Sequence, residues 1–416
     1  MEDKLKIAWF SNHPFAPTGY GVVTKNIIFG PALEGGLNTK AKCDIISFYG
    51  TDGFGMEYNG VRIWPRRFDP YGRDICELVL KYVKPDIFFT LFDIWITYDD
   101  VAKNYWLNTI HPRWCGYIPV DHRPVPDGVA EPASHGYRPI AMSKFGQEEF
   151  DKRGIKTTYI PHGCNTEIFK PLDKKKARKA LGFEDDWFII GINAANKGMR
   201  KDYPRMFEAV RKFFDDNPDA EKKTRIYAHT WPQYPDGLPL ANLVDKFGLR
   251  DKTIFTSDIK RLYGMSEGQL AEYYNVQDVY LNLSRGEGFG IPIIEAQSCG
   301  VPCIVTNFSS MPELVCNHGW KVQVEAYEMT PLMAYQALAS VHHGAECIGQ
   351  AYNKPQRLAK YSKMARQFAL GYDWKTKILP MWYNLVEDIQ SDIPEQLPFM
   401  MPKQMLESKV KMEKKR

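Results

Sequence analysis

The amino-acid sequence predicts an α/β protein of two domains, each built around a doubly wound parallel sheet. A chain of 416 residues is too long for one ordinary hydrophobic core. Short apolar runs alternate with helical patterns twice along the chain, first from Leu5 and again from Trp187. Near Gly290, a glycine-rich segment joins an apolar run to a helical pattern, as in a strand–loop–helix unit whose loop holds a ligand.

The first series of elements begins with a strand at 5–11, followed by a tight turn at 17–21 and a helix that continues to about Leu33. Further strands are expected where apolar residues gather in short runs, at 45–49, 61–64, 86–91, 113–118 and 139–141. Residues 143–152 should be helical, and the polar segment 171–176 is the expected linker. This alternation predicts the first parallel sheet.

The second series supplies another sheet and a helical carboxyl-terminal part. Strands are expected at 187–192, 225–229, 253–257, 279–283 and 303–306, and helices at 203–214, 270–275 and 292–300. A further helix should start near Ser310, whose side chain we expect to cap it. From Thr330 to Leu370 the pattern is helical, and a final helix should run from about Trp374 to Ile389.

The segment 281–302, LNLSRGEGFGIPIIEAQSCGVP, carries the most informative pattern. Its alternating apolar start indicates a buried strand, and Pro292 has the fixed φ that is favoured at the first position of a helix. The loop between them should aim the backbone N–H groups of Gly288, Phe289 and Gly290 at the space above that helix, where the helix dipole favours an anion. A phosphate is the natural ligand of such a loop.

Two carboxylates, Glu287 in the loop and Glu295 in the expected first helical turn, would repel a bare phosphate unless each binds something else. Hydroxyl groups are suitable partners. A nucleotide sugar, with a diphosphate between two hydroxylated rings, would therefore satisfy every group in the segment. A loop that merely turns between strand and helix would explain the glycines but not the carboxylates.

The pattern Ser284-x-x-Glu287-Gly-Phe-Gly, followed by Glu295 after seven intervening residues, resembles the E-x7-E signature of retaining glycosyltransferases, in particular glycosyltransferase family 4. Weaker similarity extends from about Lys6 to Trp374. The resemblance implies a GT-B fold, with two facing Rossmann-like domains and a carboxyl-terminal helix that crosses back to the first domain. It implies an acceptor-side domain at 1–170, completed by 373–395, and a nucleotide-sugar-binding domain at 171–372. Residues 396–416 are expected to form a basic tail because of their charge.

The resemblance also implies cations for the donor diphosphate, because in the family an arginine and a lysine about five residues apart follow the first strand of the second domain. Lys201 fits the lysine. Asn196 stands at the expected arginine position and offers only a neutral hydrogen bond, so we expect Arg200 to substitute. Such cations would stabilise the charge that develops on a leaving nucleoside diphosphate. Solvated side chains at a helix start are the alternative.

Gly19 and Gly21 lie in the turn that follows the first strand. Thr24 occupies the place of the third glycine of a dinucleotide-binding fingerprint, so that motif is incomplete. The resemblance implies a loop that lets the acceptor and the diphosphate approach the backbone, and an ordinary strand-to-helix turn is equally open.

Asp121 and His122 follow the strand at 113–118, beyond the carboxyl end of which open α/β sheets bind their ligands. Either side chain would suit a sugar hydroxyl or the deprotonation of an acceptor. Because neighbouring side chains diverge, we expect only one of them to face the cleft, with Asp121 slightly preferred. A turn aspartate beside an exposed histidine is the alternative.

Composition narrows the class of protein further. A hydrophobic content of 44% with 25% charged residues is typical of a soluble globular protein, and the absence of a signal-peptide pattern predicts a cytoplasmic location. The eight scattered cysteines are expected to be reduced core residues, without a zinc site. The net charge of +4 equals that of residues 403–416, a tail expected to be disordered or to contact an anionic surface weakly.

Together these observations predict a metal-independent glycosyltransferase that moves a hexosyl or pentosyl group from a nucleoside diphosphate sugar, by default a UDP-sugar. The family resemblance implies retention of configuration. Glu287 would contact the sugar and Glu295 the ribose. No cofactor besides this substrate is expected. The acceptor is open: a glycan, lipid, protein, metabolite or modified nucleic acid would fit. A nucleotide-sugar epimerase, a phosphorylase, or a non-catalytic nucleotide-sugar-binding subunit remain alternatives.

Overall fold

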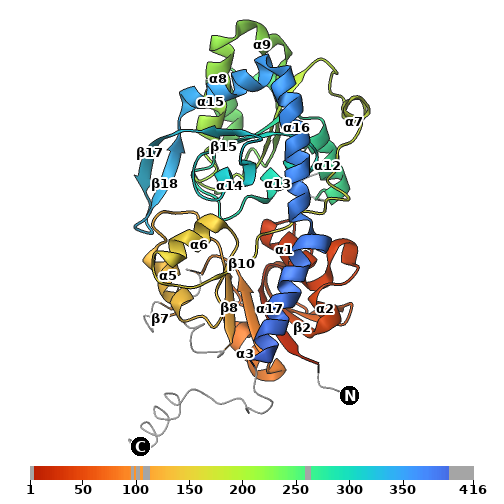
Figure 1. Ribbon diagram of the computed structural model, residues 1–416, viewed down its shortest axis with the longest axis vertical. Coiled ribbons are helices and arrows are strands. Elements are labelled where there is room, and N and C mark those ends of the chain that lie inside the picture. Colours follow the sequence, from red (N-terminus) through yellow and green to blue (C-terminus); the bar gives the residue numbers. More distant parts are fainter. Residues whose placement is uncertain (1–3, 95–97, 100–103, 106–112, 258–263, 393–416) are drawn as a thin grey trace, which may run out of the picture. The chain divides into compact units, whose positions relative to one another are not determined.

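A computed structural model of the protein describes residues 4–94, 98–99, 104–105, 113–257 and 264–392 (Figure 1). Within these residues the chain forms two compact α/β units. The first unit comprises Met1–Ile118, Glu131–Ile140 and Leu379–Arg416, and the second Pro119–Ala130 and Ala141–Ile378. The expected basic tail at 396–416 lies outside the described residues.

The first sheet is predominantly parallel. Its strands are β1 (Lys6–Ser11), β2 (Lys42–Asp52), β3 (Met56–Tyr58), β4 (Val61–Arg66), β5 (Ile87–Leu91), β8 (Trp114–Ile118), β9 (Ile140–Ala141) and β10 (Thr158–Tyr159). Their order is β10-β9-β8-β5-β1-β2-β4-β3, in which β1 pairs in parallel with β2 and β5. A two-stranded ribbon pairs β6 (Tyr98–Asp99) with β7 (Asn104–Tyr105). The strands predicted in this part of the sequence are therefore present.

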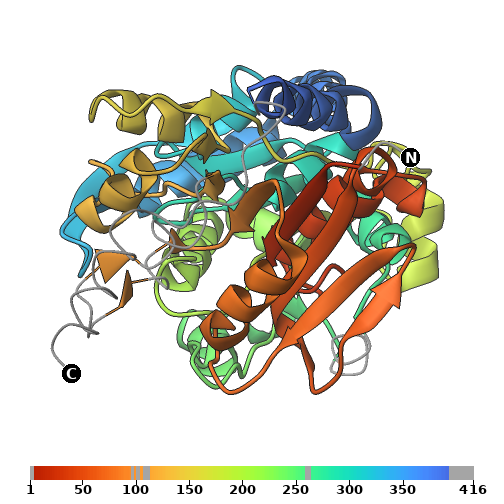
Figure 2. The same cartoon turned by 90° about the horizontal axis from the view of Figure 1, so that it is seen from below.

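Helices flank this sheet. They are α1 (Gly19–Phe29), α2 (Leu37–Lys40), α3 (Arg73–Val83), α5 (Asp127–Ser134) and α17 (Leu379–Ser391), with a 3-10 turn η1 (Pro31–Leu33). Figure 2 shows α3 lying along the sheet, where it buries its apolar side against β1, β2 and β4. Trp382 of α17 packs edge-on against Trp9 and Tyr117, with ring centroids 5.5 and 5.1 Å apart. The predicted return of the final helix to the first unit is confirmed.

The second sheet is entirely parallel. Its strands are β11 (Phe188–Asn193), β12 (Thr224–His229), β13 (Thr253–Phe255), β14 (Val279–Asn282), β15 (Cys303–Thr306) and β16 (Trp320–Val322). They lie in the order β13-β12-β11-β14-β15-β16 and all their pairings are parallel. The first five of these strands were predicted from the sequence.

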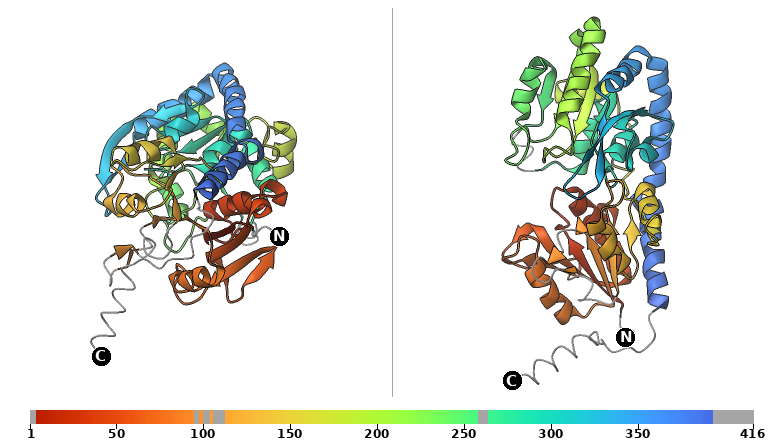
Figure 3. Two further views of the ribbon diagram at one scale, coloured as in Figure 1. Left: turned by 60° about the horizontal axis from the view of Figure 1, so that its bottom comes forward. Right: turned by 90° about the vertical axis from the view of Figure 1, so that its left-hand side faces the viewer.

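The second unit contributes the remaining helices. They are α6 (Lys144–Asp151), α7 (Lys174–Leu181), α8 (Tyr203–Asp216), α9 (Pro218–Lys223), α10 (Leu240–Lys246), η3 (Arg250–Lys252), α12 (Glu267–Asn275), α13 (Ile291–Ser298), α14 (Met311–Val315), α15 (Val341–Asn353), α16 (Pro355–Ala369), η4 (Leu370–Tyr372) and the π-helix η5 (Trp374–Ile378). Helices α8, α10 and α15 form the larger core against one side of the sheet, whereas α7 and α12 pack around Ile189 and Tyr227 (Figure 3). Both sheets thus have the layered arrangement of Rossmann-like domains.

The division between the units groups residues 141–170 with the second unit, whereas we expected a domain boundary at 170. Two observations account for this grouping. The Glu313 carboxylate accepts hydrogen bonds from the backbone N–H groups of Lys144 and Phe145, both at 3.0 Å. Cys164 pairs with Asp373 in an isolated parallel bridge. The expected boundaries at 170 and 372 remain a prediction of where one domain ends and the other begins.

The structure of residues 324–339 shows that one prediction was wrong. The sequence pattern indicated a helix from Thr330, but β17 (Val324–Met329) and β18 (Tyr335–Ala339) form an antiparallel hairpin, and helix begins only at Val341. The strand β18 pairs with the neighbouring β17, and the N–H of Ala337 also donates to the carbonyl of the distant Arg285. A partner so distant in the chain is invisible to a local pattern.

Two further expectations concern the cysteines and the membrane. Seven of the eight cysteines are buried, whereas Cys316 is exposed, so the expectation of core cysteines fails at that position. Among the described residues, no helix is both long and apolar enough to cross a bilayer.

Candidate functional site

The loop between β14 and α13 carries Glu287, and neighbouring loops fix its path. The backbone N–H of Glu287 donates to Ser309 Oγ at 2.9 Å. Ser310 Oγ lies 2.8 Å from the carbonyl oxygen of Glu287 and 2.6 Å from that of Phe289. Because one hydroxyl proton serves either carbonyl, Ser310 holds both ends of this short segment. Ser310 makes no capping bond to α14, so the predicted capping role was wrong.

Two glycines allow the same loop to pass close to residues 119–121. A Cβ atom at Gly286 would lie 2.2 Å from the backbone oxygen of Asp121, and one at Gly288 would lie 2.6 Å from Cβ of Pro119. Only glycine fits such distances. The loop around Glu287 and the segment that carries Asp121 are therefore in direct contact within the second unit.

The predicted anion-binding amides are at the start of α13. The helix begins at Ile291, with Gly290 as its N-cap at φ 107°. No acceptor among the described residues is hydrogen-bonded to the N–H groups of Gly288, Phe289 and Gly290. Their role in binding an anion stays a prediction.

Glu287 is held between two cations. Lys201 Nζ lies 2.5 Å from Glu287 Oε1, and Arg200 Nη1 lies 3.0 Å from Glu287 Oε2 and donates to the carbonyl of Gly286. Burial opposes ionisation of Glu287, but the two cations outweigh it and lower the pKa of this carboxyl to about 2. Burial lowers the pKa of Lys201, against the opposing charge of Glu287. Glu287 is therefore ionised in the folded protein. It pairs with Lys201 and Arg200, the cations that were expected to bind a diphosphate, and the sequence pattern could not reveal this pairing.

Asp121 and His122 contact each other, contrary to the expectation that their side chains diverge. His122 Nδ1 lies 2.6 Å from Asp121 Oδ1, and Arg200 Nε lies 3.8 Å from Asp121 Oδ2. Burial opposes ionisation of Asp121, but the hydrogen bond from His122 and the charge of Arg200 outweigh it and lower its pKa. The alternative of an exposed histidine is excluded too, because His122 is only 6% exposed. Together, Asp121, Arg200, Lys201 and Glu287 form one charged cluster.

Glu295 contacts a different set of residues from this cluster. The hydroxyl of Tyr274 donates to Glu295 Oε2 at 2.8 Å, and the amide of Asn193 donates to that hydroxyl at 2.6 Å. Because α13 begins at Ile291, Glu295 is in its second turn and not in the first turn as expected. The predicted contact of Glu295 with a ribose remains a prediction.

Asn196 has a structural role in the second unit. Its amide nitrogen donates to the carbonyls of Trp231 and Leu238, and its Oδ1 accepts from the N–H of Leu238. Both amide protons are therefore engaged in holding the loop that follows β12. The donor-binding role predicted for Asn196 has no support from these contacts.

Gly19 and Gly21 belong to the first unit, and the structure does not group them with the residues of the second unit. The N–H of Gly21 donates to Thr18 Oγ1, the N-cap of α1, and a Cβ atom there would lie 2.4 Å from the carbonyl oxygen of Ala16. This close approach is a local, structural reason for a glycine at position 21. The donor-binding roles of both glycines stay predictions.

Several residues of the site escaped the sequence analysis, namely Ser309, Arg285 and Gly286. Arg285 Nε binds Asp202 at 2.9 Å, and its guanidinium also contacts Glu328 of the hairpin. The only signal was adjacency to the recognised motif, because Arg285 and Gly286 immediately precede Glu287.

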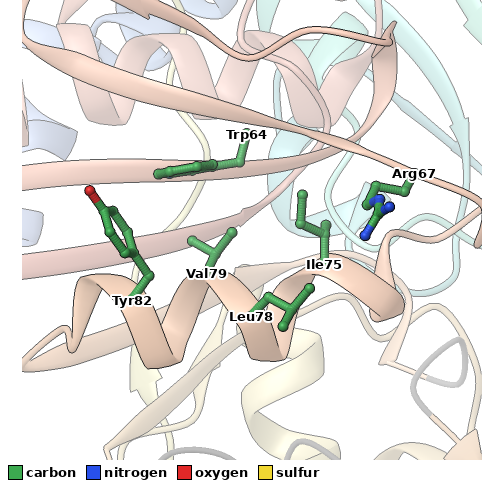
Figure 4. A pocket seen from close by; sticks show the side chains of 6 residues that line it. All are labelled: Trp64, Arg67, Ile75, Leu78, Val79 and Tyr82. Carbon is green, nitrogen blue, oxygen red and sulfur yellow. The ribbon is translucent and has the colours of Figure 1, made fainter.

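The first unit contains a separate cavity of about 470 Å³. Figure 4 shows that side chains of α3 and β4 turn toward one another across this cavity. The residues that line it are Trp64, Arg67, Ile75, Leu78, Val79 and Tyr82. None of the predicted site residues lines this cavity. Within the described ranges, no three His, Cys, Asp or Glu side chains are grouped so that they could hold a metal ion.

Known proteins resemble this chain in part of its sequence and in its fold. Residues 173–361 match the family model described as "Glycosyl transferases group 1". D-inositol 3-phosphate glycosyltransferase of Stackebrandtia nassauensis is 27% identical over 166 residues, which are 39% of this chain and 36% of that protein. The lipopolysaccharide core biosynthesis mannosyltransferase LpsB of Rhizobium meliloti is 27% identical over 162 residues, 39% of this chain and 43% of that protein. The chain thus spans less than half the length of these curated relatives.

Solved structures match nearly the whole chain. Sucrose-phosphate synthase from Thermosynechococcus elongatus superimposes with a TM-score of 0.72 at 16% identity, covering 94% of this chain and 100% of that one. HepE of Anabaena, in complex with UDP-glucose, gives a TM-score of 0.67 at 15% identity over 93% of this chain and 100% of that one. Residues 173–361 therefore match the glycosyl transferases group 1 family, and the chain has the GT-B fold of two Rossmann-like domains found in these solved structures.

Proposed function

We propose that the protein is a glycosyltransferase that uses a nucleoside diphosphate sugar, by default a UDP-sugar, and that retains the anomeric configuration. One observation carries this proposal: Glu287, Lys201 and Arg200 converge beside the open N–H groups of residues 288–290. A diphosphate needs cations and amide donors, and a sugar needs a fixed carboxylate. The HepE structure, determined with UDP-glucose, supports the choice of donor.

In the proposed reaction the bond between the anomeric carbon and the diphosphate oxygen breaks, and its electron pair leaves with the diphosphate. The acceptor oxygen bonds to the same face of the anomeric carbon. The acceptor's proton passes to the departing phosphate, or to the Asp121–His122 pair where that pair contacts the acceptor. Lys201, Arg200 and the start of α13 supply positive potential for the leaving group, which supports a reaction without a metal.

The charge of the cluster sets a condition on this mechanism. Glu287 engages both cations in the described structure. A bound diphosphate must therefore share Lys201 and Arg200 with that carboxylate, or take them over while Glu287 turns to the sugar hydroxyls. Asp121, also near Arg200, adds to the negative charge that the donor meets.

A thermal-shift panel of UDP, GDP, ADP and their sugar conjugates tests the proposal. A nucleotide at a hundredfold its Kd should add about 2.7 kcal/mol to the free energy of unfolding and raise the Tm clearly. Release of the nucleoside diphosphate in the presence of candidate acceptors then measures turnover. No shift with any nucleotide would contradict the proposal. Tight binding without hydrolysis or transfer would identify a non-catalytic binding subunit, and sugar phosphate release that requires phosphate would identify a phosphorylase.

Ser310→Ala should weaken the donor site because the carbonyls of Glu287 and Phe289 lose their shared hydroxyl partner. We expect a loss of about 1–3 kcal/mol in the free energy of unfolding, together with a lower affinity for the nucleotide that the panel identifies. Urea unfolding and titration calorimetry measure the two effects. Ser340→Ala removes the N-cap of α15 and is the matched control, expected to lower stability alone by about 1 kcal/mol. Unchanged nucleotide affinity in Ser310→Ala would contradict the assignment.

A further inference from the structure

Asp202 is a buried aspartate that follows Lys201 and immediately precedes α8. Its backbone lies in the left-handed region, at φ 46° and ψ 51°, which glycine adopts freely and other residues adopt at a cost. Its side chain is only 2% exposed. Aspartate at the N-cap of a helix ordinarily accepts a hydrogen bond from the first turn, but Asp202 makes no capping bond to α8. The strain and the burial of this residue therefore point to another task for its carboxylate.

The partner of this carboxylate is Arg285. Arg285 Nε lies 2.9 Å from Asp202 Oδ2, and the arginine side chain is 13% exposed. Arg205 Nε lies 3.8 Å from the same oxygen and is a more distant second cation. Arg285 also contacts Glu328 of the β17–β18 hairpin, whose side chain is 51% exposed. Because a buried ion pair is less screened than an exposed one, Asp202 is the partner that fixes the position of Arg285.

The two residues of this pair come from the two loops that carry the charged cluster. Asp202 is the next residue after Lys201, and Arg285 lies two residues before Glu287. The backbone N–H of Arg285 also donates to the carbonyl of Arg200 at 2.8 Å. The loops 200–202 and 285–287 are therefore joined twice over, by the direct contacts of Glu287 with its cations and by a second link through Arg285.

The two links differ in what a bound donor would do to them. In the proposed function the diphosphate shares Lys201 and Arg200 with Glu287, or takes them over while Glu287 turns to the sugar. The direct link then weakens at the moment when its geometry matters most. Asp202 and Arg285 are buried against each other, so the donor has no need of either side chain. The second link is the one that can persist while the first is exchanged.

We propose that Asp202 and Arg285 form a positioning pair, which keeps the loop of the two cations at a fixed spacing from the loop of Glu287 during donor exchange. Neither residue has to touch the substrate. This inference rests on the proposed function for its benefit to turnover, because only a bound diphosphate competes for the cations. The spacing itself exists without a ligand, and it is measurable in the nucleotide-free protein.

Urea unfolding without nucleotide tests the spacing. Asp202→Asn keeps the shape of the side chain, and asparagine tolerates the left-handed backbone. Glu287→Gln should shift the urea midpoint by about half as much, or less, in the Asp202→Asn background as in the wild type, because the cations are no longer held against Glu287. Loss of the Asp202 charge alone would act in the opposite direction, since Lys201 and Arg200 would then depend more on Glu287. The sign of the change therefore separates a lost position from a lost charge.

Release of UDP from UDP-glucose, measured per folded molecule, tests the consequence for turnover. Asp202→Asn and Arg285→Met should each lower turnover by roughly tenfold, through looser placement of the cations. The double variant should lose no more than either single variant, because the two residues act as a unit. Arg285→Lys keeps a cation beside Asp202 and should retain more turnover than Arg285→Met. Glu328→Gln removes only the exposed partner of Arg285 and is the control, expected to match the wild type in both experiments.

Two results would overturn the proposal. One is an equal or larger midpoint shift from Glu287→Gln in the Asp202→Asn background. The other is wild-type turnover in Asp202→Asn, or losses from the two single variants that add up in the double variant. A wild-type protein that releases no UDP would contradict the proposed donor instead, and the urea comparison would still decide the role of the pair. If Asp202→Asn does not fold, Arg285→Met takes its place in that comparison.

Discussion

Glu287→Gln should lower nucleotide-sugar turnover by a factor of roughly 10² to 10³, the cost of removing one group that acts on the transition state. The carboxylate would orient the sugar, and the amide that replaces it cannot bind Lys201 and Arg200 as an anion. The variant should also lose about 1–3 kcal/mol of stability, because Lys201, whose side chain is only 16% exposed, keeps its charge without its anionic partner. Release of nucleoside diphosphate and urea unfolding measure the two effects.

The double variant Glu287→Gln/Lys201→Met should distinguish the effect of the ion pair on stability from its effect on turnover. Removal of both charges should restore much of the lost stability, while turnover stays low because the diphosphate has also lost a cation. The matched control is Glu149→Gln/Lys152→Met, another buried carboxylate with a lysine at 2.5 Å. That control should leave turnover unchanged. Wild-type turnover in the Glu287→Gln/Lys201→Met protein would refute the site assignment.

The pH dependence of the same ion pair follows from the lowered pKa of Glu287. The folded value is about 2, below the ordinary value of 4.5, so the folded state favours the ionised form. The contribution of Glu287 to stability is therefore fully present above pH 4.5 and is lost as the pH falls toward 2. The difference in unfolding free energy between wild type and Glu287→Gln should shrink over this interval.

Gly286→Ala should have the second-largest effect, because its Cβ atom would lie 2.2 Å from the backbone oxygen of Asp121. The backbone cannot yield as a flexible side chain would, so one of the two loops must move. We expect a loss of about 1–3 kcal/mol of stability from overpacking. Displacement of Glu287 and Asp121 by about 1 Å should lower turnover by roughly 10².

Gly371→Ala is the control for this substitution, because a Cβ atom at Gly371 meets no atom within 4 Å. Turnover and urea unfolding of both variants, with nucleotide affinity by calorimetry, complete the comparison. A Gly286→Ala protein that turns over and unfolds as the wild type does would show that the contact between the two loops is unimportant for the site.

Local patterns were sufficient for much of the fold and for the centre of the site. The strand β14, the glycine loop and the start of α13 follow one another within the segment 281–302, and alternation, glycine and proline act over a few residues. Lys201 and Glu287 were identified through the resemblance of two short segments to family motifs, and the structure brings the two side chains together at 2.5 Å. The periodicity of the sequence likewise determined two parallel sheets, because burial on both faces requires continuous apolar runs.

Tertiary contacts decided what those patterns could not. His122 contacts one carboxylate oxygen of Asp121, while the other lies 3.8 Å from Arg200 in a distant segment. Ser310 likewise serves a distant loop instead of capping its own helix. Residues 335–339 form a strand that pairs with β17 and has further backbone partners at Arg123 and Arg285. The sequence by itself determined most of the strands and helices of the two sheets. Only the tertiary structure decided which charges and backbone groups meet, because hydrogen bonds and ion pairs between distant segments leave no periodic trace in the chain.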